Sequence, residues 1–275
     1  MCELGNLPAA AQLMDHFNLH DDLPPLDPRL VEASARELAA AHLQIPIDTS
    51  SIVLVDQWES LRFAQLALAT PPAVGGKGGM PPVCCVGLDV ENSPTSNKAT
   101  LLQVATSVNV FLFDLMALGL AVDGKGGHGG SSNRQAQSRT RELSQSFDSV
   151  IGALLSDPNI VKLGFDFGND VSHLRKSCPT LRGFQHVTSL LEVGDLSDAV
   201  LGKEVTSLSK TCEQWLGKPL DKTECTSKWE KRPLTRDQVM YAALDAHCLV
   251  GIFEEMLIER GGKLAGTGQS SQTVS

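Results

Sequence analysis

The sequence of 275 residues is poor in basic and aromatic side chains. Only 5% of its residues are aromatic, and 23 Lys and Arg stand against 32 Asp and Glu, which gives a formal net charge of −9. Proteins that coat long nucleic acids through many phosphate contacts usually carry an excess of positive charge. The composition therefore argues against broad, nonspecific coating of nucleic acid.

Long apolar runs are also missing. The longest, from Val110 to Val122, is interrupted by Asp114 and is shorter than the roughly 20 residues that a membrane-spanning helix needs. The first thirty residues hold five acidic residues and a single basic one, Arg29, which is the wrong charge for a signal peptide or an Arg-rich transit peptide. We expect an intracellular protein, in the cytoplasm or the nucleus, with no membrane partner.

The seven cysteines contain no Cys-x-x-Cys pair, and two of them, Cys84 and Cys85, are adjacent. An odd number with this spacing excludes a disulfide framework and a zinc ligand set. The cysteines are therefore typical of a reducing compartment.

Segments rich in Gly, Ser and Pro divide the chain. Residues 71–82 and a second stretch within 118–135 are predicted to be flexible insertions, and residues 261–275 a disordered tail. We expect residues 1–44 to form a short N-terminal helical extension and residues 45–260 to form a single domain.

Between these segments helical and strand patterns alternate. A helix is expected over 59–68, followed by strands over 83–90, 99–107 and 109–115 with turn-sized gaps, which is typical of a three-stranded meander. Further helices are expected over 147–155, 169–178 and 207–217, and further strands within 160–165 and 184–193. This order predicts an α/β fold in which helices flank a mixed β-sheet.

The last predicted helix carries the first candidate group. Thr235 and Gln238 form a capping box at its start, and Gly261 stands where it is expected to end. Tyr241 and Asp245 are four residues apart, so a phenol and a carboxylate project from one face. The alternative interpretation is a Tyr packed at the edge of the core beside a solvated Asp.

The strand VCCVGLDVE carries the second group. Asp89 and Glu91 are two residues apart, so their side chains emerge on the same face of a sheet. Two adjacent carboxylates repel each other unless a cation lies between them, and Mg²⁺ takes oxygen ligands of this kind. The alternative is an ordinary acidic pair at a strand end.

A third carboxylate follows the strand in KLGFDFGND. Asp170 lies where that strand gives way to a helix, and Asp166 is a rival in the same segment. Helix capping by Asn169 or Asp170 is the structural alternative, because these residue types are frequent helix caps. Periodicity alone leaves the choice between the two aspartates open.

Taken in order along the chain, the motifs become more specific. VGLDVE, LLQVAT and VFLFDL are followed by DPNIVKLGFDFGNDVSHL, LGKPLDK, RPLT and QVMYAALDAHCL. This series resembles the 3′–5′ exonuclease domain of the DEDD superfamily, in its tyrosine-bearing RNase D-like subgroup, over residues 50–260. The stretch WEKRPLTRDQVMYAALDA is most similar to the Mut-seven group, whose assigned substrate is RNA. The resemblance implies an RNase H-like exonuclease fold.

The resemblance also implies a set of site residues and two divalent ions, Mg²⁺ or Mn²⁺. Asp89 would bridge both ions, and Glu91 and Asp245 would complete one coordination sphere. Asp170 would hold the other ion through water, and Tyr241 would orient the attacking water. Such a site hydrolyses phosphodiesters by neutralising charge and supplying a nucleophile near neutral pH.

Two details of the match concern single residues. The second motif favours Asp170, six residues after Gly164, over Asp166. Many relatives follow the first-motif Glu with an aromatic residue, whereas this chain has Asn92. This departure concerns the stacking of the substrate and leaves the metal ligands intact.

The implied function is a metal-dependent 3′–5′ exonuclease that removes nucleoside 5′-monophosphates from single-stranded RNA, or single-stranded DNA, with a free 3′ end. The alternatives are a catalytically silent nucleic-acid-binding or scaffold module, and a phosphohydrolase of small nucleotides. Basic residues within 203–236 either steer the substrate or form a solvated mixed-charge surface. His173 and His247 are interpreted as packing or surface histidines, because a two-metal site needs no imidazole.

Overall fold

The protein is represented by a computed structural model that describes residues 24–69, 84–121 and 134–267, and positions 7, 10, 11 and 14. The predicted insertion 71–82 lies outside the described residues, as do residues 122–133 of the second insertion and 268–275 of the tail. No helix within the described residues is long and apolar enough to cross a membrane.

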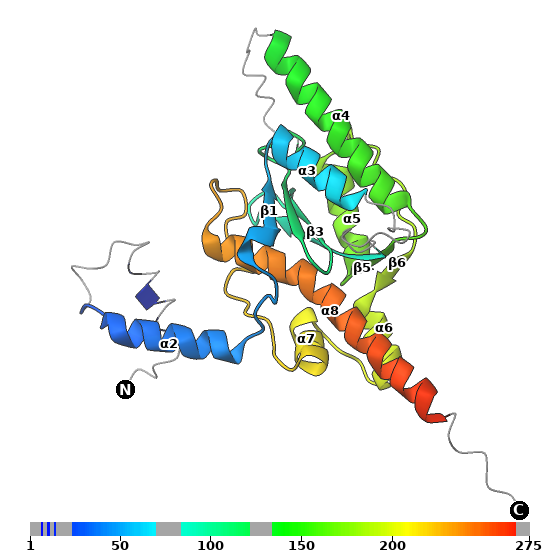
Figure 1. Ribbon diagram of the computed structural model, residues 1–275. Coiled ribbons are helices and arrows are strands. Elements are labelled where there is room, and N and C mark those ends of the chain that lie inside the picture. Colours follow the sequence, from blue (N-terminus) through cyan, green and yellow to red (C-terminus); the bar gives the residue numbers. More distant parts are fainter. Residues whose placement is uncertain are drawn as a thin grey trace, which may run out of the picture.

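The centre of the molecule is a mixed sheet of six strands in the order β1-β4-β3-β2-β5-β6 (Figure 1). The strands are β1 (Ile52–Val55), β2 (Cys85–Asn92), β3 (Ala99–Ala105), β4 (Val110–Asp114), β5 (Val161–Gly164) and β6 (Leu190–Glu192). β2, β3 and β4 form the predicted antiparallel meander. β1 joins β4, β5 joins β2 and β6 joins β5, all in parallel. The predicted mixed sheet is confirmed.

Helices cover both faces of this sheet. They are α3 (Trp58–Leu68), α4 (Arg134–Ser156), α5 (Phe167–Ser177), α6 (Val193–Leu201), α7 (Leu208–Leu216) and α8 (Arg236–Thr267). A further helix, α2 (Pro28–Ala41), and a 3-10 turn η1 (Thr49–Ser51) precede β1. β1 and α6 have no counterpart in the sequence prediction. A four-residue apolar run is too short to distinguish a strand from a loop, and α6 follows β6 with no turn residue between them.

The two faces of the sheet bury separate apolar clusters. On β2, Val86, Leu88 and Val90 contribute to the core shared with α3, α4 and α5, whereas Cys85 belongs to the core shared with α6, α7 and α8. This division follows from the two-residue period of a strand. The fold is therefore a sheet between two helical layers (Figure 1).

A series of phenylalanine rings runs through the core shared with α3, α4 and α5. Phe111 and Phe113 on β4 continue through Phe147 to Phe184, with successive ring centroids 6.5, 5.5 and 6.2 Å apart. Leu118 and Leu120, which fall inside the predicted insertion 118–135, are buried in this same core. Residues 118–120 are therefore part of the packed domain and not of a flexible segment.

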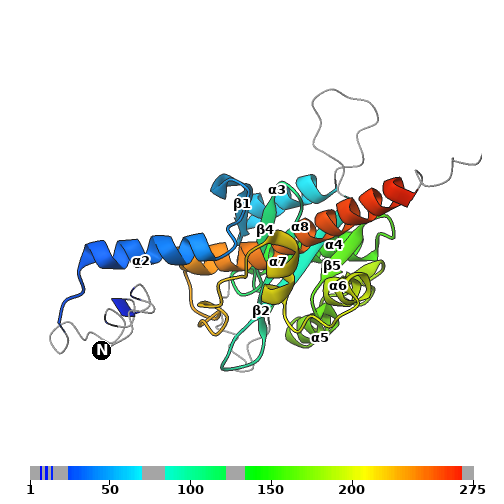
Figure 2. The ribbon, with the colours of Figure 1, turned by 90° about the horizontal axis from the view of Figure 1, so that it is seen from below.

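α2 extends away from the sheet in both views (Figure 1 and Figure 2). Pro28 is its first residue, and the carboxylate of Asp27 accepts a hydrogen bond from the Arg29 backbone N–H at 2.8 Å. At its other end, Lys218 Nζ donates to the Ala40 carbonyl at 2.7 Å. The domain thus contacts the C-terminal end of the predicted N-terminal extension.

α8 begins with the predicted capping box. The Gln238 N–H donates to Thr235 Oγ1 at 3.1 Å, and the Thr235 N–H donates to Gln238 Oε1 at 2.9 Å. The predicted end at Gly261 is wrong, since α8 continues to Thr267. A glycine ends a helix when it takes a left-handed conformation, as Gly202 (φ 66) and Gly217 (φ 81) do after α6 and α7. Gly261 instead keeps helical backbone.

α8 lies directly on β2. A Cβ at Gly87 would lie 2.0 Å from the carbonyl oxygen of Ala246, so only glycine allows this approach of the two backbones. The segment before α8 is fixed by Arg232, whose guanidinium donates to both carboxylate oxygens of the buried Asp114 at the end of β4. These contacts set where α8 stands on the sheet.

Gly87→Ala should therefore destabilise the domain by roughly 1–3 kcal/mol or more, the range for overpacking a core. The methyl group forces either β2 or α8 to move, because the atom it meets is backbone. Thermal unfolding would measure the effect. Gly251→Ala on α8 is the matched control, since its Cβ meets Leu216 at ordinary distances of 3.6 and 3.7 Å and alanine favours the helix. Equal stability of both variants would contradict the tight contact.

Candidate active site

The first two carboxylates lie on β2, on the face that α8 covers. Asp89 and Glu91 alternate with apolar residues that face the opposite core, as the sequence pattern predicts. β2 pairs with β5 only from Cys85 to Gly87, so the stretch carrying both carboxylates has β3 as its only paired strand. Glu91 is 8% exposed and Asp89 is half-buried.

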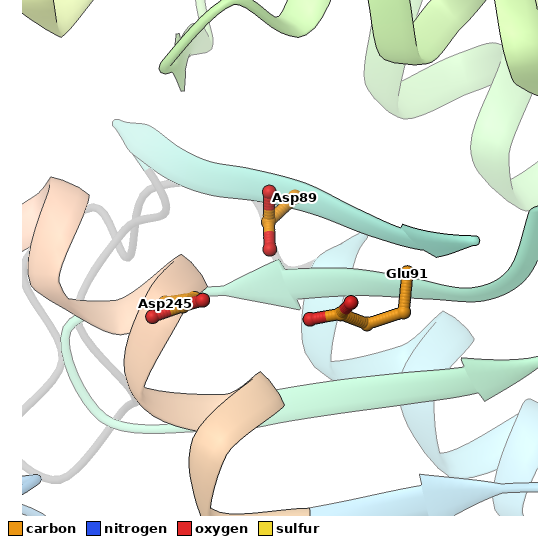
Figure 3. A group of neighbouring side chains, drawn as sticks. All are labelled: Asp89, Glu91 and Asp245. Atoms are coloured by element: carbon orange, nitrogen blue, oxygen red, sulfur yellow. The ribbon is translucent and has the colours of Figure 1, made fainter. Parts of the chain in front are cut away.

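α8 brings the third carboxylate to this face. Carboxylate oxygens of Asp89, Glu91 and Asp245 all lie within 4.8 Å of one another. Figure 3 shows the three side chains, two from the sheet and Asp245 from α8, pointing toward a common point. We call these three residues the acidic triad.

Tyr241 stands one helical turn before Asp245 on α8. The charge of the Asp245 carboxylate acts on its phenol, and its ring lies against Trp229 with centroids 6.0 Å apart. The phenol is half-buried. The interpretation of Asp245 as a solvated neighbour is therefore wrong, because that carboxylate is 8% exposed and belongs to the triad.

α5 carries Asp170 in its first turn. The chain turns tightly from β5 into this helix, since a Cβ at Gly164 would lie 2.3 Å from the Cβ of Phe167. Asp170 is half-buried, and the charge of Asp89 acts on it. It is a fourth carboxylate close enough to interact with Asp89, but it does not belong to the group within 4.8 Å.

The rival Asp166 has a different role. Asp166 directly precedes α5, has left-handed backbone (φ 62) and is exposed. Its two carboxylate oxygens accept hydrogen bonds from Asn169 Nδ2, at 2.9 and 2.8 Å. Helix capping by Asn169 or Asp170 is therefore wrong, because both lie inside α5.

The N-terminus of α5 is instead covered by Glu192. Its carboxylate accepts from the Phe167 N–H at 3.4 Å and from the Gly168 N–H at 3.3 Å. The role of Glu192 cannot be recognised from the sequence, because a single Glu at the end of a three-residue strand gives no local signal. The one available clue is that parallel β5 and β6 end at the same edge of the sheet.

Residues 79–259 match the protein family described as 3′–5′ exonuclease, which is more than half of the chain. The chain belongs to the 3′–5′ exonuclease family. Membership of the DEDD superfamily, expected from the motifs, is confirmed.

Curated relatives agree with this assignment. A human protein named Exonuclease mut-7 homolog is 30% identical over 271 residues, covering 92% of this chain and 27% of that protein. Its Drosophila melanogaster counterpart is 31% identical over 199 residues, covering 64% of this chain and 27% of that protein. The resemblance to the Mut-seven group is confirmed, and the chain spans about a quarter of the length of these relatives.

Solved structures confirm the predicted exonuclease fold. The Nibbler EXO domain of Aedes aegypti superposes with a TM-score of 0.62 at 22% identity, covering 80% of this chain and 94% of that chain. Trypanosoma brucei RNase D in complex with RNA U12 superposes with a TM-score of 0.53 at 19% identity, covering 82% and 66%. At these identities the similarity supports the fold alone.

Burial and the mutual repulsion of the carboxylates dominate the electrostatics of this candidate site. Burial, followed by the charges of Asp89, Asp245 and Asp170, raises the pKa of Glu91 to about 10. Burial and then the charge of Asp89 raise the pKa of Asp170 to about 8, and burial raises the pKa of Asp89 to about 6. The pKa of Asp245 is also raised, by burial and then Asp89, while Tyr241 and Lys222 oppose the shift. These carboxylates therefore strongly favour binding of protons or cations.

Neither histidine belongs to this group. His173 Nδ1 lies 3.3 Å from the Asn97 carbonyl at the surface of α5. His247 is buried on α8, and burial lowers its pKa. The interpretation of both as surface or packing residues agrees with these positions.

Several lysines of the 203–236 stretch make local contacts. Lys203 donates to Gln214 at 2.9 Å and Lys210 to Thr206 at 3.1 Å, and Lys218 reaches α2. Lys222 differs, because its charge acts on Asp245. The structure thus favours a mixed-charge surface for most of this stretch and brings one lysine near the exonuclease site.

Glu91→Gln should stabilise the chelator-treated protein at alkaline pH. The folded pKa of Glu91, about 10, is above its ordinary value of 4.5, so the folded state binds the extra proton and stability falls as pH rises between these values. Gln cannot ionise, so the variant does not lose this stability as the pH rises. The melting temperature of the variant should therefore exceed that of the unmodified protein by an amount that grows from about pH 5 to about pH 9. Each kcal/mol of stability corresponds to about 2–4 °C.

Melting temperatures across this pH range would test the effect. Glu213→Gln, on the exposed side of α7, is the matched control. A constant difference between Glu91→Gln and the unmodified protein at all pH values would show that Glu91 is not held protonated.

Proposed function

We propose that this exonuclease domain hydrolyses phosphodiester bonds from the 3′ end of single-stranded RNA, or single-stranded DNA, and releases nucleoside 5′-monophosphates. The observation that carries the proposal is the acidic triad, whose carboxylate oxygens lie within 4.8 Å of one another. Family membership supports the reaction class.

The donor set fits a pair of hard divalent ions, Mg²⁺ or Mn²⁺. All candidate ligands are carboxylate oxygens, which such ions prefer. Burial, followed by the neighbouring carboxylate charges, raises the pKa of Glu91 and of Asp170, and a bound cation would relieve both effects. Asp89 would contact both ions, with Glu91 and Asp245 completing the coordination of one. Asp170 would hold the other. When bound, such ions neutralise charge on the phosphate and supply a nucleophile near neutral pH.

Tyr241 would orient the attacking water. Burial, followed by the charges of Asp245 and Glu91, raises the pKa of its phenol, so the hydroxyl stays protonated and can both donate and accept. Its contact with Trp229 and its place one turn before Asp245 on α8 hold the ring beside the triad. This arrangement supports assignment to the tyrosine-bearing subgroup.

RNA is the favoured substrate class. The human relative is named an exonuclease of the mut-7 type, and one structural neighbour, an RNase D, was solved with RNA U12. A site that holds a single 3′ end makes few phosphate contacts, so the net charge of −9 is tolerable. The cytoplasmic or nuclear location expected from the sequence stays a prediction.

The decisive experiment uses 5′-labelled and 3′-labelled RNA and DNA oligonucleotides with Mg²⁺ or Mn²⁺. We expect 5′-labelled RNA to shorten stepwise and the 3′ label to leave at once as a nucleoside 5′-monophosphate, with all cleavage lost in excess chelator. Cleavage in chelator would overturn the metal assignment. Binding without cleavage would support the silent scaffold, and cleavage of nucleotides alone would support the small-molecule phosphohydrolase.

Asp170→Asn should abolish cleavage, because it removes the carboxylate that faces the triad from α5. Asp166→Asn is the matched control on the same segment and should cleave at nearly the normal rate, since Asp166 is exposed and contacts Asn169. Single-turnover cleavage would measure both variants. A greater loss from the Asp166 change would show that the second-motif carboxylate is misassigned.

Tyr241→Phe should slow single-turnover cleavage by roughly 10²–10⁴-fold, the range for a positioned acid–base group. Stability should change by less than about 1 kcal/mol, because the substitution removes one hydroxyl and leaves the ring packed against Trp229. Affinity for an oligonucleotide in Ca²⁺ should be unchanged, since the ring and the carboxylates remain. Normal cleavage would remove Tyr241 from the mechanism.

A further inference from the structure

Gln103 is a polar side chain buried beside the acidic triad. It lies in the middle of β3, is 0% exposed, and its Cα pairs with that of Asp89 on β2. Its strand neighbours at alternate positions, Leu101 and Ala105, belong to the core shared with α8. Gln103 therefore projects from the same face of the sheet as Asp89.

Neither polar atom of the Gln103 amide has a hydrogen-bond partner among the described residues. Leaving one buried polar group unpaired costs about 1–3 kcal/mol, and this side chain carries two such atoms. An apolar side chain of the same length would avoid that cost. The glutamine at this position therefore makes the core less stable than an apolar side chain of the same length would.

The residues paired with Gln103 on the two neighbouring strands indicate which polar group its side-chain amide can bind. On the β4 side its Cα partner is Leu112, which offers no polar side-chain atom. On the β2 side the partner is Asp89, and directly opposed residues of an antiparallel pair have Cβ atoms about 5 Å apart. A carboxylate accepts hydrogen bonds only, and the amide nitrogen donates two, so the pair is chemically complementary.

We propose that Gln103 is a positioning residue for the metal centre, its side-chain amide donating to the Asp89 carboxylate while that carboxylate holds divalent ions. This inference rests on the proposed function and deepens it. Groups that hydrogen-bond a metal ligand fix its orientation, and their loss weakens metal affinity. The amide would select the Asp89 rotamer that faces Glu91 and Asp245.

Gln103→Met tests the proposal, because methionine keeps the length of the side chain and removes both polar atoms. Calorimetric titration with Mn²⁺, in the absence of nucleic acid, should give an affinity roughly 10–100-fold weaker than that of the unmodified protein. The melting temperature of the chelator-treated variant should be equal or higher, because two unpaired groups have been removed. A merely structural glutamine would lower it.

Leu101→Met is the matched control, on the same face of β3 and opposite Glu91. It conserves volume and should leave Mn²⁺ affinity unchanged. Equal affinity of Gln103→Met and the unmodified protein would overturn the role of Gln103. An equal loss in both variants would also overturn it, since packing alone would then explain the result.

A second measurement needs no substitution. With glutamine-selective ¹⁵N labelling, the Gln103 side-chain amide resonances should shift on addition of Mg²⁺ and exchange more slowly with solvent. Unchanged resonances with Mg²⁺ bound would overturn the proposal. An unmodified protein that binds neither ion would overturn the proposed function as well, whereas binding and cleavage without any effect at Gln103 would overturn this inference alone.

Discussion

The approach of α8 to β2 is the contact on which the rest of the site depends. Gly87 allows the backbone of Ala246 to lie against the strand. Gly87 is two residues before Asp89 on β2, and Ala246 directly follows Asp245 on α8. The contact therefore sets both the distance and the register of the acidic triad. A side chain at Gly87 would separate the carboxylates that the chemistry needs together.

The close approach of several buried carboxylates is energetically unfavourable, and much of the surrounding structure stabilises it. Buried carboxylates with raised pKa values oppose folding at neutral pH. The two apolar cores offset that cost, and the Arg232–Asp114 pair anchors the segment that leads into α8. Glu192 adds a further acceptor at the start of α5. A cluster of buried carboxylates that lowers stability in this way is typical of a functional site.

The sequence predicts the strands and helices that carry clear periodicity, including the meander and the capping box of α8. The two-residue spacing predicts a shared face for Asp89 and Glu91, and the four-residue spacing does so for Tyr241 and Asp245. That carboxylates from different elements lie together is implied only by the resemblance to the exonuclease family. The sequence does not predict β1, whose only signal is four apolar residues, or the continuation of α8 past Gly261. The roles of Glu192 and Gln103 depend on strand pairing, which no local pattern encodes.

The neighbouring carboxylates come from β2, α5 and α8. About eighty residues of the chain separate the carboxylates on β2 from the one on α5, and about as many separate the latter from the one on α8. No contiguous fragment short of nearly the whole domain can bring them together. Contacts of such sequence separation form late in folding, after the loops between them have closed. Ion binding would then report completion of the fold: a partly folded chain would expose scattered acidic residues, and only the finished domain would concentrate enough negative charge to capture the ions and be stabilised by them.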